Sequence, residues 1–336
     1  MRKLPSAVDV ICDLSFGDSG KGKVSAYLSK VGKYSSVARW AGGDNAGHTV
    51  FLNGKKYKTN LIPSGIFHNK LSIIGPGCVL NIESFNKELS YLKENGFNTD
   101  LVKVSPKCHI VTDEHIAFDK ENLSKKLGTT SRGIAPAYAA KAARTGILAK
   151  DCLSKDLLWD EDGSGEMLCE GAQGFYLDID HGNYPYVTSS TTLPYGACSI
   201  GFPPSLIRDI YGVVKIYDTR SGEDPLFPET LFDDPELSRL GELGEEYGVV
   251  TKRRRKVNWL SMDRLIHAIR VSGANNIIIN KCDVLEALGV FKVIFKNEMI
   301  SFENIDSMKL FINKNIVSEL GSLKNQIVFS SDPELL

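Results

Sequence analysis

The feature that most constrains the fold of this chain is a glycine-rich segment near its start, residues 17–23, with the sequence GDSGKGK. The preceding residues 8–12 form a short apolar stretch with β-branched side chains, which predicts a buried strand. Residues 24–28 have the composition and spacing typical of a helix. Glycines at such a junction let backbone N–H groups converge on phosphate oxygens, and the helix directs its positive end at them. The segment therefore predicts a phosphate-binding loop.

The loop has the G-x-x-x-x-G-K spacing of a Walker A motif, but Val24 stands where that motif has serine or threonine. A GTPase switch needs that hydroxyl group, so Val24 argues against this class of protein. Asp18 inside the loop is then the candidate magnesium ligand and a candidate proton acceptor. Lys21 and Lys23 supply positive charge. A plain glycine turn with surface lysines is the alternative interpretation.

Strand-like and helix-like segments alternate along the chain. The predicted strands span residues 8–12, 36–40, 71–74, 166–169, 211–217 and 275–279, and the clearest helices span 82–95 and 259–272. This alternation predicts an α/β fold with a mainly parallel central sheet flanked by helices. Open sheets of this kind bind ligands at the carboxyl ends of their strands, where the polar loops of this chain lie. Without an internal repeat or a linker, residues 1–336 are expected to form a single large domain.

The composition limits the class of function. The formal net charge is −1 and the one dense basic run covers residues 252–256, so a small anionic ligand fits better than a nucleic acid. Seven cysteines are scattered without a CxxC pair, which favours reduced thiols and a cytoplasmic protein. The start of the sequence does not resemble a signal peptide, and no apolar run is long enough to span a membrane, so no membrane partner is expected.

Segment 17–23 resembles the GDEGKGK signature of the adenylosuccinate synthetases, and later segments resemble that family in the same order. They are residues 45–49 (NAGHT), 128–138 (GTTSRGIAPAY), 170–190, 219–229 and the basic segment 251–259. The resemblance covers residues 8–285. It implies a ligase of purine nucleotide biosynthesis. Such an enzyme uses GTP to phosphorylate O6 of IMP, and L-aspartate then displaces the phosphate to give adenylosuccinate.

The resemblance implies a catalytic role for a few of these residues. Asp18 matches the base that removes the N1 proton of the purine, and it also matches a ligand of the Mg²⁺ cofactor. His48 matches the donor of a hydrogen bond to the transferring phosphoryl group, whereas alone it would be read as a structural loop histidine. Lys21 is the third catalytic candidate. The carbonyl group of Gly47 matches a second magnesium ligand.

The remaining implied contacts divide among three substrates. GTP is expected at Gly17, Ser19, Gly20, Lys21, Gly22, Lys23, Lys281 and Asp283. IMP is expected at Asp18, Asn45, Thr130, Arg144, Gln173, Thr188 and Arg253. L-aspartate is expected at Thr251, Arg253 and Arg255, because arginine bonds carboxylates in bidentate fashion.

Two of these residues carry further implications. Asp283 ends a segment, NKCD, that resembles the family's KLD and the NKxD of GTPases, and its carboxylate suits the guanine edge, so GTP is favoured over ATP as donor. Arg144 matches an arginine that reaches the nucleotide of a partner subunit, which implies a homodimer. A polar strand-end turn and a solvated helix arginine are the respective alternatives.

Several positions depart from the family pattern. Ser19 replaces glutamate and Lys252 replaces glycine, features that resemble a viral branch that makes 2-amino-2'-deoxyadenylosuccinate from dGMP. In that branch the catalytic aspartate is often serine, whereas Asp18 is retained here and would crowd a 2-amino group. IMP is therefore the favoured acceptor and dGMP the alternative. The altered loops also leave open a catalytically inactive nucleotide-binding paralogue.

Overall fold

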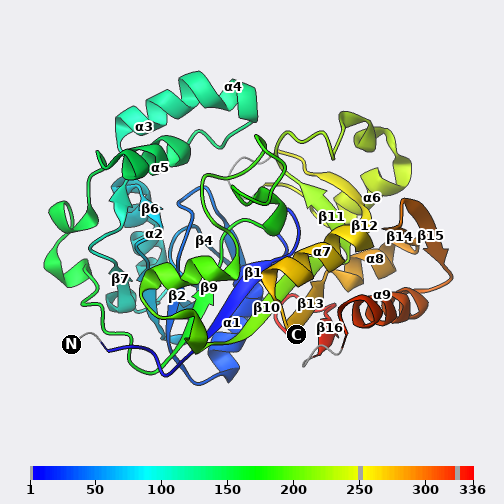
Figure 1. The fold of residues 1–336 in the computed structure, drawn as a ribbon, viewed down its shortest axis with the longest axis horizontal. Coiled ribbons are helices and arrows are strands. Elements are labelled where there is room, and N and C mark those ends of the chain that lie inside the picture. Colours follow the sequence, from blue (N-terminus) through cyan, green and yellow to red (C-terminus); the bar gives the residue numbers. More distant parts are fainter. Residues whose placement is uncertain (1–2, 249–252, 322–325) are drawn as a thin grey trace.

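The computed structural model describes residues 3–248, 253–321 and 326–336. At its centre lies a sheet whose strand order is β16-β13-β10-β1-β9-β2-β5-β7 in the described part of the chain (Figure 1). Every pairing in it is parallel, which confirms the predicted fold class. The strands are β1 (Ala7–Asp13), β2 (Tyr34–Arg39), β5 (Leu71–Ile74), β7 (Val102–Val104), β9 (Glu166–Glu170), β10 (Ile207–Lys215), β13 (Asn276–Asn280) and β16 (Ile327–Phe329).

The two faces of the central sheet are covered by different parts of the chain. Ile11 of β1 packs with Val24 and Leu28 of helix α1 (Lys21–Val31) on one face. Val10, one residue earlier and therefore on the opposite face, packs with the segment Pro194–Ile200. Burial on both faces explains why the strands are nearly continuous apolar runs.

A second sheet with the order β11-β12-β14-β15 lies to the right of the first in Figure 1. It lies there together with helices α6 (Pro235–Leu243), α8 (Cys282–Leu288) and α9 (Ile305–Leu320). Its strands are β11 (Tyr217–Arg220), β12 (Lys256–Ser261), β14 (Phe291–Phe295) and β15 (Glu298–Phe302). Two smaller pairs are β3 (His48–Leu52) with β4 (Lys55–Thr59) and β6 (Val79–Leu80) with β8 (His109–Ile110).

The remaining helices cover the edges and ends of these sheets. They are α2 (Ile82–Glu94), α3 (Asp113–Phe118), α4 (Ser124–Leu127), α5 (Ile134–Ala143), α6 (Pro235–Leu243), α7 (Met262–Ser272), α8 (Cys282–Leu288) and α9 (Ile305–Leu320). Short 3-10 turns lie at Ser64–His68, Thr99–Leu101, Ala149–Asp151, Lys155–Leu157, Phe175–Leu177, Pro194–Ile200, Pro204–Leu206 and Glu229–Asp233, and a π-helical turn lies at Asp119–Leu123. None of the helices in the described residues is long and apolar enough to cross a bilayer.

Two sequence-based boundaries are wrong. The strand predicted over residues 211–217 is two strands in different sheets, because β10 ends at Lys215 and β11 begins at Tyr217. The backbone N–H of Ile216 between them donates to the carbonyl oxygen of Asn280. The helix predicted over 259–272 begins only at Met262, because the three preceding residues belong to β12. Trp259 pairs with β11, and Leu260 and Ser261 pair with β14. The other predicted strands, and the predicted helix 82–95, match elements of the structure.

Candidate active site

A cavity of about 520 Å³ opens at the carboxyl ends of the central strands. Loops that follow β1, β9, β11 and β13 contribute to its wall, as the parallel sheet leads one to expect. The cavity brings together most of the sequence-predicted site residues: Gly17, Asp18, Ser19, Gly20, Lys21, Gly22, Lys23, Asn45, Gly47, His48, Thr130, Gln173, Thr188, Arg253, Arg255, Lys281 and Asp283.

Among the predicted site residues that the structure describes, Arg144 alone is not in this wall. Arg144 is exposed at the C-terminal end of α5, in the left-handed conformation with φ 64°, and it is not among the residues that line the cavity. Its predicted contact with a partner subunit stays a prediction. Thr251 and the departure at Lys252 lie outside the described residues.

The phosphate loop joins β1 to α1 as its sequence predicts. Gly20 caps the helix with φ 98°, a conformation that favours glycine, and a Cβ atom there would lie 2.8 Å from Nδ2 of Asn280. That same amide nitrogen donates to the carbonyl oxygen of Ser19 at 2.8 Å. The end of β13 therefore holds the loop from the side, and the helix N-terminus faces the cavity.

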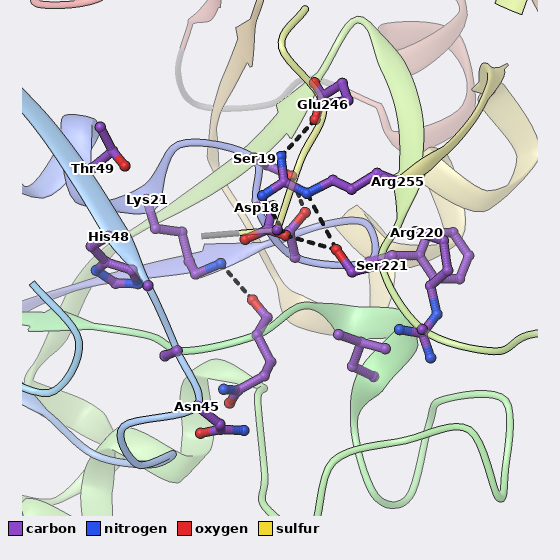
Figure 2. Close-up of a pocket in the computed structure, with 18 of the residues that line it drawn as sticks. Asp18, Ser19, Lys21, Asn45, His48, Thr49, Arg220, Ser221, Glu246 and Arg255 are labelled. Atoms are coloured by element: carbon purple, nitrogen blue, oxygen red, sulfur yellow. Dashed lines mark hydrogen bonds and ion pairs between the residues drawn. The ribbon is translucent and has the colours of Figure 1, made fainter. Parts of the chain in front are cut away.

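Asp18 lies between the basic side chains of the two walls of the cavity. Figure 2 shows Lys21 and His48 on one side of it and Arg255 on the other. Oδ2 of Asp18 lies 2.9 Å from Nη2 of Arg255, and it accepts a hydrogen bond from Oγ of Ser221 at 3.3 Å. Burial raises the pKa of Asp18, but the nearby cations, Arg255 first among them, outweigh burial and hold the pKa below its ordinary value. Asp18 is therefore an ionised acceptor at neutral pH.

Arg255 belongs to a buried cluster that the sequence analysis missed. Its Nη1 donates to Oε2 of Glu246 at 2.6 Å, and Nζ of Lys215 lies 2.8 and 2.9 Å from the two carboxylate oxygens of Glu246. Burial alone would raise the pKa of Glu246, but Lys215 and Arg255 lower it to about 2. Burial also lowers the pKa of Lys215 to about 8. Glu246 thus fixes the arginine that contacts Asp18.

His48 is held by a second carboxylate that the sequence analysis left without a role. Nδ1 of His48 bonds to Oε1 of Glu170, the last residue of β9. Glu170 also accepts from Oγ of Ser25 at 2.6 Å and from the backbone N–H of Ser64 at 2.8 Å. Burial would raise the pKa of Glu170, but His48 and its other partners, Arg39 included, lower it to about 2. The ionised carboxylate accepts a hydrogen bond, so Nδ1 is the donor. In the neutral ring Nε2 then carries no proton.

Burial, together with the charge of Arg39, lowers the pKa of His48 itself, even though Glu170 acts in the opposite direction. The imidazole ring is therefore neutral at pH 7, with its proton on Nδ1. Any negative charge that enters the cavity beside Nε2 would favour a second proton on the ring. His48, held by Glu170, can therefore take up a proton when an anion binds beside Nε2.

Lys23 ties the phosphate loop to the C-terminal segment. Its Nζ donates to Oδ1 of Asn280 at 3.1 Å, to Oγ of Ser330 at 2.6 Å and to the carbonyl oxygen of Asp332 at 2.5 Å. Burial lowers the pKa of Lys23 to about 8, against the charge of Asp332. Asp283, Asp332 and Pro333 line the same end of the cavity. The sequence analysis assigns no role to segment 330–333, because the contacts of Lys23 with Ser330 and Asp332 join residues 307 and 309 positions apart.

Gln173 has the features of a ligand contact. It adopts the left-handed conformation with φ 56°, and its buried Oε1 has no hydrogen-bond partner among the described residues. A buried acceptor of this kind is costly unless a ligand or water satisfies it. On the opposite wall, Thr129 donates to the buried carboxylate of Asp119 at 2.6 Å, which positions the loop that carries Thr130. Nη1 of Arg253 donates to the carbonyl oxygen of Gly128 in this loop at 3.3 Å.

Comparisons with known proteins show what this chain is similar to. A family model described as adenylosuccinate synthetase matches residues 10–162 and 156–314. Adenylosuccinate synthetases of Streptococcus sanguinis (strain SK36) and Levilactobacillus brevis are each 38% identical to the chain, over 342 and 341 residues. In both cases the match covers 84% of this chain and 79% of the relative.

Solved structures give the same result for the fold. Fully ligated adenylosuccinate synthetase from Plasmodium falciparum has a TM-score of 0.81 and 26% identity, and the match covers 98% of both chains. Succinoaminodeoxyadenylate synthetase of cyanophage S-2L, solved with dGMP and dATP, has a TM-score of 0.73. At 20% identity, over 99% of this chain and 94% of that one, this second likeness shows the fold alone.

Proposed function

Because the chain belongs to the adenylosuccinate synthetase family, we propose that it is a ligase that joins L-aspartate to IMP and converts GTP to GDP and phosphate. The product is adenylosuccinate, an intermediate of purine nucleotide biosynthesis. The observation that carries this proposal most directly is the ionised Asp18 inside the phosphate loop, facing His48 across the cavity. A proton acceptor and a potential phosphoryl contact thus flank one reacting centre.

The first step activates the purine oxygen. Asp18 removes the proton from N1 of IMP, and the negative charge moves to O6. O6 then attacks the γ-phosphorus atom of GTP, and the bond to the β–γ bridging oxygen breaks, which releases GDP. The low pKa of Asp18 keeps it ionised and ready to accept this proton at neutral pH.

His48 stabilises the charge that moves onto the phosphoryl group. With Nδ1 bonded to Glu170, Nε2 is the nitrogen that serves the cavity. The negative phosphoryl oxygens favour a proton on Nε2, which then donates a hydrogen bond to them. Lys21 supplies a second positive group on the same side of the site.

The second step forms the carbon–nitrogen bond. The amine of L-aspartate attacks C6, the C6–O6 bond breaks, and phosphate leaves with O6 while the amine loses a proton. Arg253 and Arg255 are the arginines available to bind the aspartate carboxylates, with Thr251 as a third candidate. In the structure Arg255 is bonded to Asp18 and Glu246, so it would hold the incoming amino acid beside the base.

The donor nucleotide lies along the phosphate loop in this proposal. Its phosphates meet the N-terminus of α1 and the loop lysines, and its base extends toward Lys281 and Asp283. A carboxylate at position 283 accepts from both N1–H and the 2-amino group of guanine, which favours GTP over ATP. The remaining donor contacts are those expected from the sequence.

Magnesium fits the groups that face the donor phosphates. Asp18 offers a carboxylate and Gly47 a backbone carbonyl, and both line the cavity. Mg²⁺ characteristically takes one or two protein oxygens and completes its shell with phosphate oxygens and water. The described residues contain no cluster of three or more His, Cys, Asp or Glu side chains around a metal site, which agrees with this sparse protein contribution. When bound, the ion would neutralise charge on the transferring phosphate.

Acceptor binding and assembly complete the proposal. Asn45, Thr130, Gln173 and Thr188 hold IMP, and the unpaired Oε1 of Gln173 suits a hydroxyl group of the nucleotide's sugar or another donor of the ligand. The exposed position of Arg144 suits a contribution to the site of a second subunit in a homodimer.

We further infer that residues 1–336 act as one domain, since a single apolar cluster contains side chains of both large sheets. The unpaired cysteines fit a reducing cytoplasm.

A substrate panel tests the proposed function. Purified protein with Mg²⁺ and L-aspartate receives IMP, dIMP, GMP or dGMP, each with GTP or ATP, and mass spectrometry detects the succinyl product. Adenylosuccinate from IMP and GTP is the expected result, with slower turnover on ATP. Product from dGMP alone would establish the viral-type activity instead. Absence of product from every acceptor, in protein that still binds nucleotide, would mark an inactive paralogue.

A further inference from the structure

Asp13, at the end of β1, is a buried carboxylate to which the proposed reaction assigns no role. Its exposed fraction is 3%. Oδ1 accepts from the backbone N–H groups of Ser15 at 2.9 Å and Gly17 at 3.2 Å. Oδ2 accepts from the backbone N–H of Ser19 at 3.3 Å and from Nζ of Lys21 at 2.9 Å. One carboxylate thus gathers three amides and one ammonium group at the base of the phosphate loop.

The ammonium group of Lys21 is fixed between two acceptors. Besides Asp13, it donates to the carbonyl oxygen of Gln173 at 2.5 Å. Lys21 is only 4% exposed, and what it exposes faces the cavity. An ammonium group has three donors, and the hydrogen bonds it makes to the described residues use two of them. The third N–H therefore remains for a group inside the cavity.

The same contact joins the two nucleotide sites. Gln173 is the candidate purine contact, and its backbone carbonyl receives Lys21 from the phosphate loop. Close approach of the two loops depends on Gly174, where a Cβ atom would lie 2.3 Å from the backbone N of Gly17 and 2.8 Å from Oδ1 of Asp13. The ion pair of Asp13 and Lys21 thus lies at the junction between the donor loop and the acceptor loop.

We propose that Asp13 is a positioning residue of the reaction. Its carboxylate holds Lys21 so that the third N–H of Lys21 contacts the phosphoryl group during its transfer between the two nucleotides. Asp13 contacts no substrate itself and acts through Lys21. The inference rests on the proposed function, because it takes the transferring phosphoryl group as the ligand of Lys21. Interactions made mainly in the transition state change kcat more than KM, which gives the proposal its kinetic signature.

The test compares Asp13→Asn with a matched control, Asp9→Asn. Asp9 is a buried aspartate on the same strand, bonded to Arg208 at 2.7 and 3.0 Å at the end away from the loop. For Asp13→Asn we expect kcat for adenylosuccinate formation to fall about 10- to 100-fold, with KM values changed less than about threefold. Asp9→Asn leaves kcat unchanged.

A double-mutant cycle shows whether Asp13 acts through Lys21. Lys21→Met lowers kcat, and Asp13→Asn added to Lys21→Met changes kcat less than about twofold, because the partner is already gone. The double variant also removes both members of a buried pair, which is less disruptive than removing one. If Asp13→Asn alone does not fold, the comparison of Lys21→Met with the double variant still shows whether Asp13 acts through Lys21. A further tenfold loss in the double variant would overturn the proposal.

A readout without turnover separates this inference from the proposed function. Pulse acetylation at one fixed pH, followed by mass spectrometry of the Lys21 peptide, reports how firmly the amine of Lys21 is held. We expect faster acetylation of Lys21 in Asp13→Asn than in wild-type protein or Asp9→Asn, because the amine loses one of its two hydrogen-bond acceptors. If the wild-type protein makes no adenylosuccinate but acetylation of Lys21 still rises in Asp13→Asn, the proposed function is contradicted and the ion pair is retained. If the wild-type enzyme is active but Asp13→Asn changes neither kcat nor the reactivity of Lys21, the inference is contradicted and the proposed function is not.

Discussion

Oδ2 of Asp18 lies 2.9 Å from Nη2 of Arg255, and the other terminal nitrogen of the same guanidinium group lies 2.6 Å from Oε2 of Glu246. One arginine therefore connects the proposed base to a fully buried carboxylate. It lowers the pKa of Asp18 and is itself a candidate ligand of L-aspartate. In the proposed reaction, this one side chain would couple proton removal from IMP to binding of the amino acid.

Asp18→Ala should abolish ligation without unfolding the protein. The variant removes the proton acceptor, and we expect kcat to fall about 100- to 10,000-fold. The side chain is 32% exposed into the cavity, so its loss creates no core cavity. Residue 18 has a left-handed φ of 57°, which alanine tolerates less well than aspartate, so the melting temperature should fall by only a few degrees. Steady-state kinetics and thermal unfolding measure both effects, with Asp18→Asn as the isosteric comparison. Substantial residual turnover would remove Asp18 from the role of base.

Arg255→Gln should shift the acid limb of kcat/KM to higher pH. Arg255 is the strongest of the charges that lower the pKa of Asp18, so its removal raises that pKa, and the base is protonated at pH values where the wild-type base is ionised. The KM for L-aspartate should also rise. Arg253→Gln is the comparison, because Arg253 is not among the main influences on Asp18; it should raise KM for aspartate and leave the acid limb in place. Identical pH profiles for both variants would contradict the coupling.

The sequence predicts the parts of this molecule that are contiguous in the chain. The strand before residue 17 and the helix after it place the phosphate loop, and the parallel sheet follows from the alternation of elements. The break at Ile216 could not be read from the chain, because residues 211–217 are apolar apart from Lys215. Only the pairing of Tyr217 with Trp259 shows that the strand has changed sheets. Local pattern does not report the partner of a strand.

The missed residues of the site are those that act through distant partners. Glu170 lies 122 residues from His48, and Asp18 belongs to a cluster with Lys215 and Glu246 that forms only in the fold. Buried carboxylates at the carboxyl ends of strands are the signal that could have found Glu170, which directly precedes a glycine loop. Asp13 ends β1 in the same way.

Glu170→Gln should lower kcat, and the loss should grow with pH. Glu170 raises the pKa of His48 against burial, so without its charge the ring is harder to protonate when the phosphoryl group arrives. We expect kcat at pH 7 to fall about 10- to 100-fold. The control is Glu88→Gln, a buried carboxylate outside the cavity wall that accepts from the backbone N–H groups of residues 60–62. It should alter stability alone; an equal loss of kcat in the two variants would contradict the assignment.

GTP affinity should weaken as the pH rises through about 8. The pKa of Lys23 in the folded protein is about 8, so its charge is present below that value and lost above it. A neutral lysine at the phosphate loop attracts the triphosphate less strongly. Calorimetric titration of Mg·GTP between pH 7 and 9.5 measures the trend. Lys23→Arg should flatten it, because arginine stays charged throughout this range. An equally steep pH dependence in Lys23→Arg would show that another group is responsible.

Glu246→Gln should destabilise the protein most at neutral pH. Its folded pKa of about 2 lies below the ordinary value of 4.5, so its ionised form stabilises the fold above pH 4.5, and that stability is lost as the pH falls toward 2. The variant also leaves Lys215 and Arg255 buried without their carboxylate, a change that costs roughly 3–5 kcal/mol. Urea denaturation from pH 2 to 8 should therefore show a wide gap between wild-type protein and variant above pH 5.

That gap should close toward pH 2, because protonated glutamate and glutamine carry the same charge. The control is Glu83→Gln, an exposed carboxylate whose contact with Lys87 lies on the surface of α2. Exposed pairs of this type contribute little, so its curve should follow the wild-type curve. Parallel curves for wild-type protein and Glu246→Gln across the whole range would show that Glu246 is not ionised in the folded protein. Arg255, which contacts Asp18, would then have no charged Glu246 to hold it in place.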